Sequence, residues 1–194
     1  MSQSIPIHRE VHMHYTNKQL TKLMSNTLIN YLPPSLAPTI VLCIGTDRST
    51  GDSLGPLTGT LLSNKELQHL VVYGTLHQPV HAMNLQETIH EIDQTFCNPY
   101  IIAVDAALGK TKSIGHIITH NRPIQPGAAL NKDLPAVGDA YITGVVNVGG
   151  VMEYAVLQST RLSTVYDMAE KIASILYRID RSLHPAYFRT KSLI

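Results

Sequence analysis

One short apolar run rich in β-branched residues, TIVLCI at residues 39–44, constrains the fold of this chain more than any other feature. Such runs, without polar alternation, are typical of strands covered on both faces of a parallel sheet. Further strands are expected at residues 70–76, 100–104, 116–119 and 141–148, separated by helical apolar spacing at 16–32, 53–63, 84–96 and 160–181. This alternation predicts one α/β domain over residues 1–194, a three-layer sandwich with a mostly parallel sheet and helices on both faces. Residues 1–15 are expected to form a flexible tail.

Composition narrows the classes of function. The 194 residues carry a formal net charge of +1 and no run of Lys or Arg. Nucleic-acid binding depends on basic side chains that neutralise phosphates, and the sequence shows no cluster of them. No stretch approaches the ~18 apolar residues needed to span a membrane, and the first 15 residues lack an apolar segment of signal-peptide length. We therefore expect a soluble cytoplasmic protein that binds neither nucleic acid nor membranes.

The metal-ligating and nucleophilic residue types give no strong signal. Cys43 and Cys97 lie in separate expected elements, which favours two buried, reduced and unlinked thiols. His8, His12 and His14 are close in sequence, but their spacing matches no closed metal site. No metal centre is expected.

Two acidic residues follow expected strands, where α/β sheets form their binding sites. Asp52 closes the glycine-containing loop after the 39–44 strand and opens a helix, and Asp105 ends the apolar run IIAV. Each has a structural alternative, a helix N-cap for Asp52 and a strand-end turn for Asp105. The loop lacks the three-glycine dinucleotide pattern and the phosphate-loop Gly-Lys pair, and the chain has no Gly-x-Ser-x-Gly elbow. Carboxylate chemistry is the hypothesis that remains.

Three segments carry a resemblance to a known family. CIGTDRSTGDSLGP, IIAVDAALGKTKSIGHI and IQPGAALNK resemble the signature segments of the germination protease that degrades small acid-soluble spore proteins. They are still more similar to a smaller sporulation-associated, spore-protease-like family, and more loosely to hydrogenase maturation endopeptidases. The resemblance implies a phosphorylase/hydrolase-like fold and a peptidase acting in the cytoplasm of the sporulating cell or forespore. Its substrate would be a protein or peptide, with small acid-soluble spore proteins as candidates.

The resemblance also assigns residues. The two aspartates proposed as catalytic in the germination protease match Asp52 in DSLGP and Asp105 in DAAL. Hydrogenase maturation endopeptidases place a metal-contacting histidine after the position of Gly127, where this chain has Ala128 and Ala129. The resemblance therefore implies a metal-independent carboxylate pair and no cofactor. In such a pair one carboxylate activates water while its protonated partner hydrogen-bonds the scissile carbonyl.

Substrate binding is assigned to residues of the same segments. Gly45 and Asp47 lie in the loop that ends at Asp52, although Asp47 could equally be a solvated loop residue, and Gly127 and Asn131 lie in the PGAALN segment. Two other functions stay open. A catalytically inactive sporulation protein could use the cleft, or the surface of residues 149–161, to bind a protein partner. A nucleotide-binding protein is the weaker alternative, because the loop has no phosphate-binding pattern.

Overall fold

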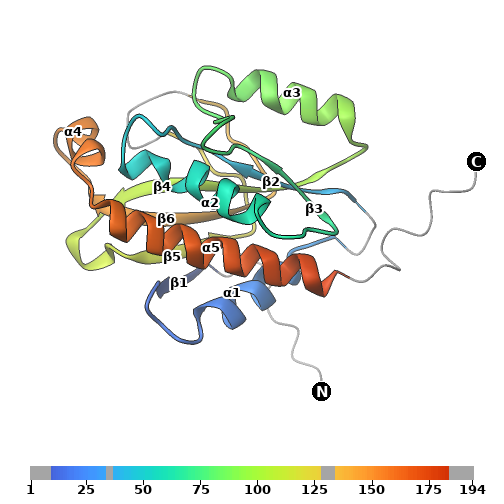
Figure 1. Ribbon diagram of the computed structural model, residues 1–194, viewed down its shortest axis with the longest axis horizontal. Coiled ribbons are helices and arrows are strands. Elements are labelled where there is room, and N and C mark those ends of the chain that lie inside the picture. The colour runs from blue at the N-terminus through green and yellow to red at the C-terminus, as the bar shows by residue number, and fades with distance from the viewer. Residues whose placement is uncertain (1–9, 34–36, 128–133, 184–194) are drawn as a thin grey trace, which may run out of the picture.

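The computed structural model describes residues 10–33, 37–127 and 134–183. These residues form one six-stranded sheet in the order β1-β5-β6-β4-β2-β3 (Figure 1). The strands are β1 (Val11–His14), β2 (Thr39–Cys43), β3 (Leu70–Tyr73), β4 (Tyr100–Gly109), β5 (His116–His120) and β6 (Ala140–Val148). The helices are α1 (Leu20–Ile29), α2 (Leu54–Ser63), α3 (Leu85–Thr95), α4 (Glu153–Gln158) and α5 (Leu162–Ser182), with 3₁₀ turns η1 (Gly51–Ser53) and η2 (Thr111–Ser113).

The sheet is parallel across four of its strands. β2 pairs in parallel with β3 and β4, and β4 pairs in parallel with β6. β5 is antiparallel to both β6 and β1, so the sheet is mixed. The short connection from β4 through η2 to β5 is shorter than a parallel crossover requires, which explains the reversal. The α/β fold with a mostly parallel sheet is confirmed.

Helices cover the two faces of the sheet unequally. α1, α2 and α5 pack on one face, in a core with Val41, Val104 and Ile142. α3 covers the other face through Leu85 and Ile92. α5 runs the length of the sheet (Figure 1), and its fully buried residues recur at helical spacing because one stripe faces the core. No helix among residues 10–33, 37–127 and 134–183 is both long and apolar enough to cross a membrane.

Glycines set the position of α2 against the sheet. A side chain at Gly55 would overlap the carbonyl oxygen of Ile44, and one at Gly59 would overlap that of Gly74. The backbone of α2 therefore lies directly against the end of β2. This close approach fixes where η1, which precedes α2, stands relative to the sheet.

A buried carboxylate joins the carboxyl end of α5 to the start of β3. Asp180 is fully buried, and its Oδ1 accepts hydrogen bonds from the amides of His69 at 2.8 Å and Leu70 at 2.9 Å. Its Oδ2 accepts a hydrogen bond from a third amide, that of Gln68, at 3.0 Å. The charge is thus compensated by backbone dipoles, which makes Asp180 a structural residue.

Two sequence expectations are wrong. Residues 11–14, expected in a flexible tail, form the edge strand β1, because Val11 and Met13 pack against the core while the backbone pairs with β5. Residues 1–9 lie outside the described ranges. Cys97, expected to be buried, is exposed because it follows the last turn of α3, whereas Cys43 is buried in β2; both thiols are free.

Candidate active site

A cavity of about 600 Å³ lies at the carboxyl edge of the parallel strands. Its wall is formed by the loop after β2, the η1 turn, the residues before α3, β4, and residues from the connection between β5 and β6. It is lined by Ile44, Gly45, Thr46, Asp47, Arg48, Asp52, Pro79, His81, Ala82, Met83, Asp105, Gly127 and Leu134. Asp52 and Asp105, 53 residues apart in sequence, therefore line one cavity.

Asp105 lies inside a strand and not at its end. β4 continues to Gly109 because it stays paired with β6, where Asp105 faces Thr143. On its other side the pairing with β2 ends at Cys43↔Val104. Asp105 is thus the first residue of β4 beyond the end of β2. The prediction that β4 ends before Asp105 is wrong, although the neighbouring strand β2 does end at that level. The turn-residue alternative for Asp105 is excluded.

Burial dominates the chemistry of the Asp105 carboxyl. The residue is only 6% exposed, and its Oδ1 accepts a hydrogen bond from the amide of Ala106 at 2.9 Å. Desolvation, and next the negative charge of Asp52, raise the pKa of Asp105 from 3.8 to about 7. The amides of Ala106 and Gly127 offset part of this pKa rise because they stabilise the charged form. Asp105 therefore holds its proton up to near neutral pH.

Asp52 sits in the middle of η1 and is less buried than Asp105. The N-cap residues are Thr50 for η1 and Ser53 for α2, so the N-cap alternative for Asp52 is wrong. The helical turn begins at Gly51, two residues before the expected helix at residues 53–63. Since its charge acts on the pKa of Asp105, the two carboxylates are in electrostatic contact across the cavity.

Gly45 has a structural reason to be glycine. Its φ is +142°, and a side chain there would overlap the carbonyl oxygen of Asp52. Its amide donates a hydrogen bond to the carbonyl oxygen of Val80 at 2.8 Å. Gly45 thus holds η1 and the segment before α3 close to the end of β2, and its amide is already engaged within the protein.

The other predicted binding residues are placed as follows. Asp47 is exposed at the cavity wall, and Gly127 lines the cavity and faces Asp105. Asn131 lies outside the described residues, as do Ala128 and Ala129. Their assigned roles remain predictions.

His81 is a further residue of the cavity, and it is not among the predicted site residues. It lines the 600 Å³ cavity, and its Nδ1 is buried with no hydrogen-bond partner among the described residues. The amide of His81 donates to Oδ1 of Asn84 at 2.8 Å, which fixes the histidine backbone before α3. Its neighbour Val80 bridges Ile44 at the end of β2. That bridge is a tertiary contact, so no sequence signal indicates it.

Two further cavities adjoin the first. One, of about 630 Å³, shares Asp105 and is lined also by Arg122 and Glu153. The other, of about 440 Å³, shares Pro79 and His81. The 630 Å³ cavity thus adjoins the first at Asp105, and the 440 Å³ cavity adjoins it at Pro79 and His81. Within residues 10–33, 37–127 and 134–183, no three His, Cys, Asp or Glu side chains are grouped so that they could hold a metal ion.

The strands and helices define a single α/β domain with a mixed six-stranded sheet, and a protein of known structure shares this fold. The structure is similar to a [NiFe] hydrogenase maturation protease, HycI from Thermococcus kodakarensis KOD1, with a TM-score of 0.54 and 15% identity. The match covers 79% of this chain and 98% of HycI, and at this identity it shows the fold alone.

The sequence places the chain in a particular family. Residues 12–175 match the family described as Protein of unknown function (DUF1256), and the chain belongs to it. It is 49% identical over 165 residues to the uncharacterized protein YyaC of Bacillus subtilis (strain 168). That match covers 85% of this chain and 79% of YyaC.

Proposed function

We propose that this protein is a peptidase that hydrolyses peptide bonds with Asp52 and Asp105. The observation that carries the proposal is the buried carboxyl of Asp105, whose pKa is raised to about 7 beside Asp52 in a cavity of about 600 Å³. Strongly perturbed carboxyl groups in a cavity are typical of catalytic acids and bases. A protonated carboxyl beside a second carboxylate could supply the acid and the base that amide hydrolysis needs.

The geometry suggests a division of labour. Asp105, the more deeply buried group, stays protonated and hydrogen-bonds the scissile carbonyl oxygen. Asp52, the more exposed group, takes a proton from the attacking water. The tetrahedral intermediate then collapses as the leaving amine gains a proton and the bond from carbon to nitrogen breaks. The pair shares one proton during this cycle, so its two apparent pKa values belong to both residues.

The resemblance of the motifs is the basis for proposing a role in sporulation. The motifs around Asp52 and Asp105 resemble those of the germination protease and of sporulation-associated proteins, and HycI is itself named a protease. We propose a protein or peptide substrate, with small acid-soluble spore proteins as candidates, and action in the cytoplasm of the sporulating cell or forespore. The proposed mechanism uses no metal, because the resemblance to the germination protease implies a metal-independent carboxylate pair.

The test compares wild-type protein with Asp52→Asn, Asp105→Asn and the double variant on peptide libraries and on small acid-soluble spore proteins, with mass spectrometry of the products. Hydrolysis should be lost in each single variant, and the double variant should be little worse, because the two groups act as a unit. Asp93→Asn, which changes an exposed carboxylate on α3 away from the cavity lining, is the control for an Asp-to-Asn change. Hydrolysis that survives in either single variant would refute the proposal. If the wild type hydrolyses nothing, an inactive sporulation protein that binds a partner is the better assignment.

A further inference from the structure

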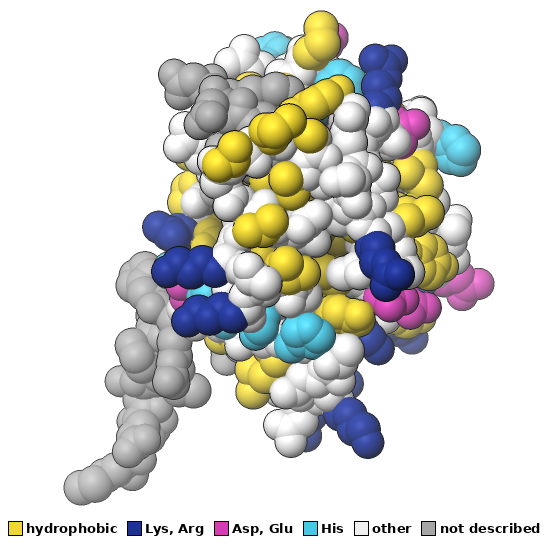
Figure 2. Space-filling view, turned by 90° about the vertical axis from the view of Figure 1, so that its left-hand side faces the viewer, with side chains coloured by type: hydrophobic (Ala, Val, Ile, Leu, Met, Phe, Trp, Pro, Cys, Tyr) yellow, Lys and Arg dark blue, Asp and Glu magenta, His cyan; other side chains and the backbone are white. Residues whose placement is uncertain are grey.

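Exposed hydrophobic side chains gather at one end of the molecule. Of the nine large hydrophobic residues exposed in the described ranges, six lie between residues 148 and 166. This set, called here the α4 surface, consists of Val148, Val151, Met152, Tyr154, Leu162 and Tyr166. Figure 2 shows this end of the molecule, with hydrophobic and uncharged side chains across its middle and most charged side chains toward its margins. An exposed apolar cluster of this kind marks an interaction site.

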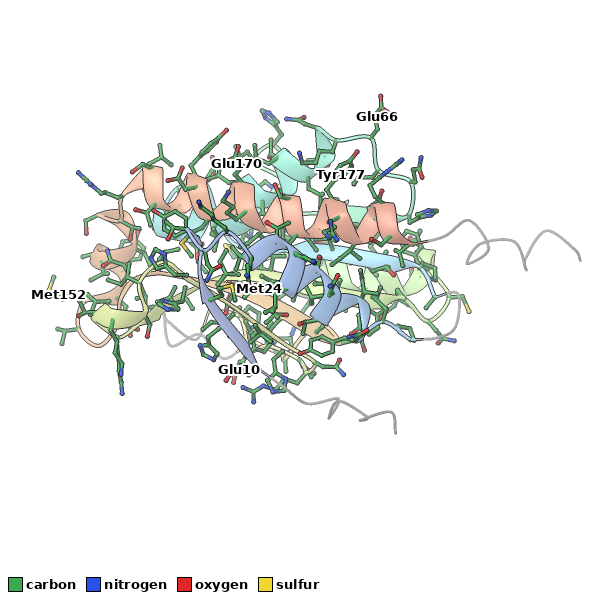
Figure 3. The ribbon with its side chains drawn as sticks, turned by 90° about the horizontal axis from the view of Figure 1, so that it is seen from below. Glu10, Met24, Glu66, Met152, Glu170 and Tyr177 are labelled. Carbon is green, nitrogen blue, oxygen red and sulfur yellow. The ribbon has the colours of Figure 1, made fainter. Side chains whose placement is uncertain are left out.

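The backbone presents the most exposed members of the cluster to solvent. Val151 is 80% exposed and Met152 is 74% exposed. Met152 has φ 53° and ψ 43°, a left-handed conformation that is unfavourable for a long side chain. Figure 3 shows Met152 pointing away from the protein at the end of the molecule. Packing within the chain explains neither the conformation nor the exposure.

The α4 surface is continuous with the candidate active site. Glu153, the first residue of α4, lines the 630 Å³ cavity that also contacts Asp105. On its inner side α4 packs against η1: a side chain at Gly51 would meet Leu157 Cδ2 at 2.7 Å and Thr160 Oγ1 at 3.0 Å. Since η1 carries Asp52, one short helix connects the exposed cluster with both carboxylates.

We propose that the α4 surface docks an apolar, uncharged segment of the polypeptide whose peptide bond enters the cavity at Asp52 and Asp105. This inference rests on the proposed peptidase function and adds an accessory binding site for the substrate. Continuity with the cavity selects a substrate segment as the occupant. The scarcity of charge selects its chemistry, because Glu153 and Arg161 are the two charged residues between Val148 and Tyr166. Of these, Glu153 already accepts a hydrogen bond at its Oε1 from the amide of Gly150. A docked segment would also hold α4 against η1 and so keep Asp52 in place.

The test uses the full chain with Asp105→Asn, to prevent turnover, and dephosphorylated β-casein as an unfolded polypeptide probe. The double variant Val151→Ser, Met152→Ser should bind the labelled probe about tenfold more weakly by fluorescence anisotropy, as expected for loss of two apolar anchors. Leu23→Ser on α1, an exposed hydrophobic outside the α4 surface, is the matched control and should bind as before. Unchanged thermal melts establish that both variants are folded.

Three results would overturn the docking proposal: no binding of the probe, equal weakening by the control, or a wild-type dimer that the double variant converts to a monomer in sedimentation velocity. The last result would assign the α4 surface to a second copy of the chain. Hydrolysis is measured separately on octapeptides, too short to reach both the cavity and the α4 surface. For this assay Val151→Ser and Met152→Ser are made in the chain that keeps Asp105. Loss of octapeptide hydrolysis in Asp105→Asn, with normal hydrolysis in the Val151→Ser, Met152→Ser chain, supports both proposals. Probe binding by a protein that hydrolyses no peptide leaves the docking surface standing and refutes the peptidase.

Discussion

Replacing Asp105 with Asn should make the protein more stable at alkaline pH and leave its stability nearly unchanged at acidic pH. The carboxyl is buried, and its pKa is raised from 3.8 to about 7 on folding. Between these two values the folded state keeps a proton that the unfolded state has lost. The free energy of unfolding therefore falls as the pH rises through this window, and it is level again above pH 7.

The size of this loss in the free energy of unfolding follows from the shift in the pKa of Asp105. A difference of about 3 pH units, at 1.36 kcal/mol per unit, corresponds to about 4 kcal/mol lost between acidic pH and pH 8. Asn has the shape of the protonated acid, and its oxygen can accept the amide of Ala106. At pH 8 the variant should therefore melt about 8–16 °C above the wild type, taking 2–4 °C per kcal/mol for a chain of this size.

The assay is urea or thermal unfolding of wild type and variant at half-unit steps from pH 4 to pH 9. Asp47→Asn, which removes an exposed charge from the same loop, should give a curve parallel to that of the wild type. Asp52→Asn should weaken the pH dependence without abolishing it, because burial, the larger cause of the pKa rise, remains. Parallel curves for wild type and Asp105→Asn across the whole range would show that Asp105 ionises normally, and would remove the basis of the proposed acid.

Three further outcomes are expected. Asp180→Ala should lower the free energy of unfolding by about 3–5 kcal/mol in urea titrations, since three backbone amides lose a charged acceptor; a change below 1 kcal/mol would contradict this. In native protein a thiol reagent should modify Cys97 and spare Cys43, whose pKa burial raises, and both should react after denaturation without reductant; a single reactive thiol in denatured protein would indicate a disulfide. Gly59→Ala should destabilise the fold in thermal melts, because its side chain would overlap the carbonyl oxygen of Gly74, and an unchanged melting temperature would show that α2 can move away from the sheet.

The sequence predicts those elements whose pattern is set by burial along their own length. The run of residues 39–44 is buried throughout in β2, and the apolar stripe of α5 follows the helical period. The strand β1 escaped notice because it is a four-residue edge strand with two histidines, stabilised by pairing with β5, a strand more than 100 residues away in sequence. The extension of β4 beyond Val104 likewise depends on its pairing with β6. These features depend on contacts between distant segments, which local patterns do not encode.

In the candidate site, too, some features follow from local sequence patterns and others depend on contacts between distant segments. The rule that parallel strands end at one edge of the sheet is enough to bring Asp52 and Asp105 together. Gly45 shows the limit of motif reasoning, because the motif does not report two structural contacts. The amide of Gly45 donates a hydrogen bond to Val80, and its missing side chain leaves room for the backbone of Asp52. His81 joins the cavity through the bridge between Val80 and Ile44, which no local pattern reports.

The presence of Asp and not Asn at position 105 is itself an argument for the proposed catalytic role. Asn at this position would accept the amide of Ala106 equally well and would carry no charge beside Asp52. Asp instead costs the fold about 4 kcal/mol above pH 7, because the unfolded chain gives up its proton far more easily. Asp180 shows that the same protein can bury a carboxylate at a structural position when three amides compensate it. The carboxyl of Asp105 has fewer amides to compensate its charge, and it lies near the negative charge of Asp52. A structural role does not need this arrangement, whereas an acid catalyst needs the raised pKa that it produces.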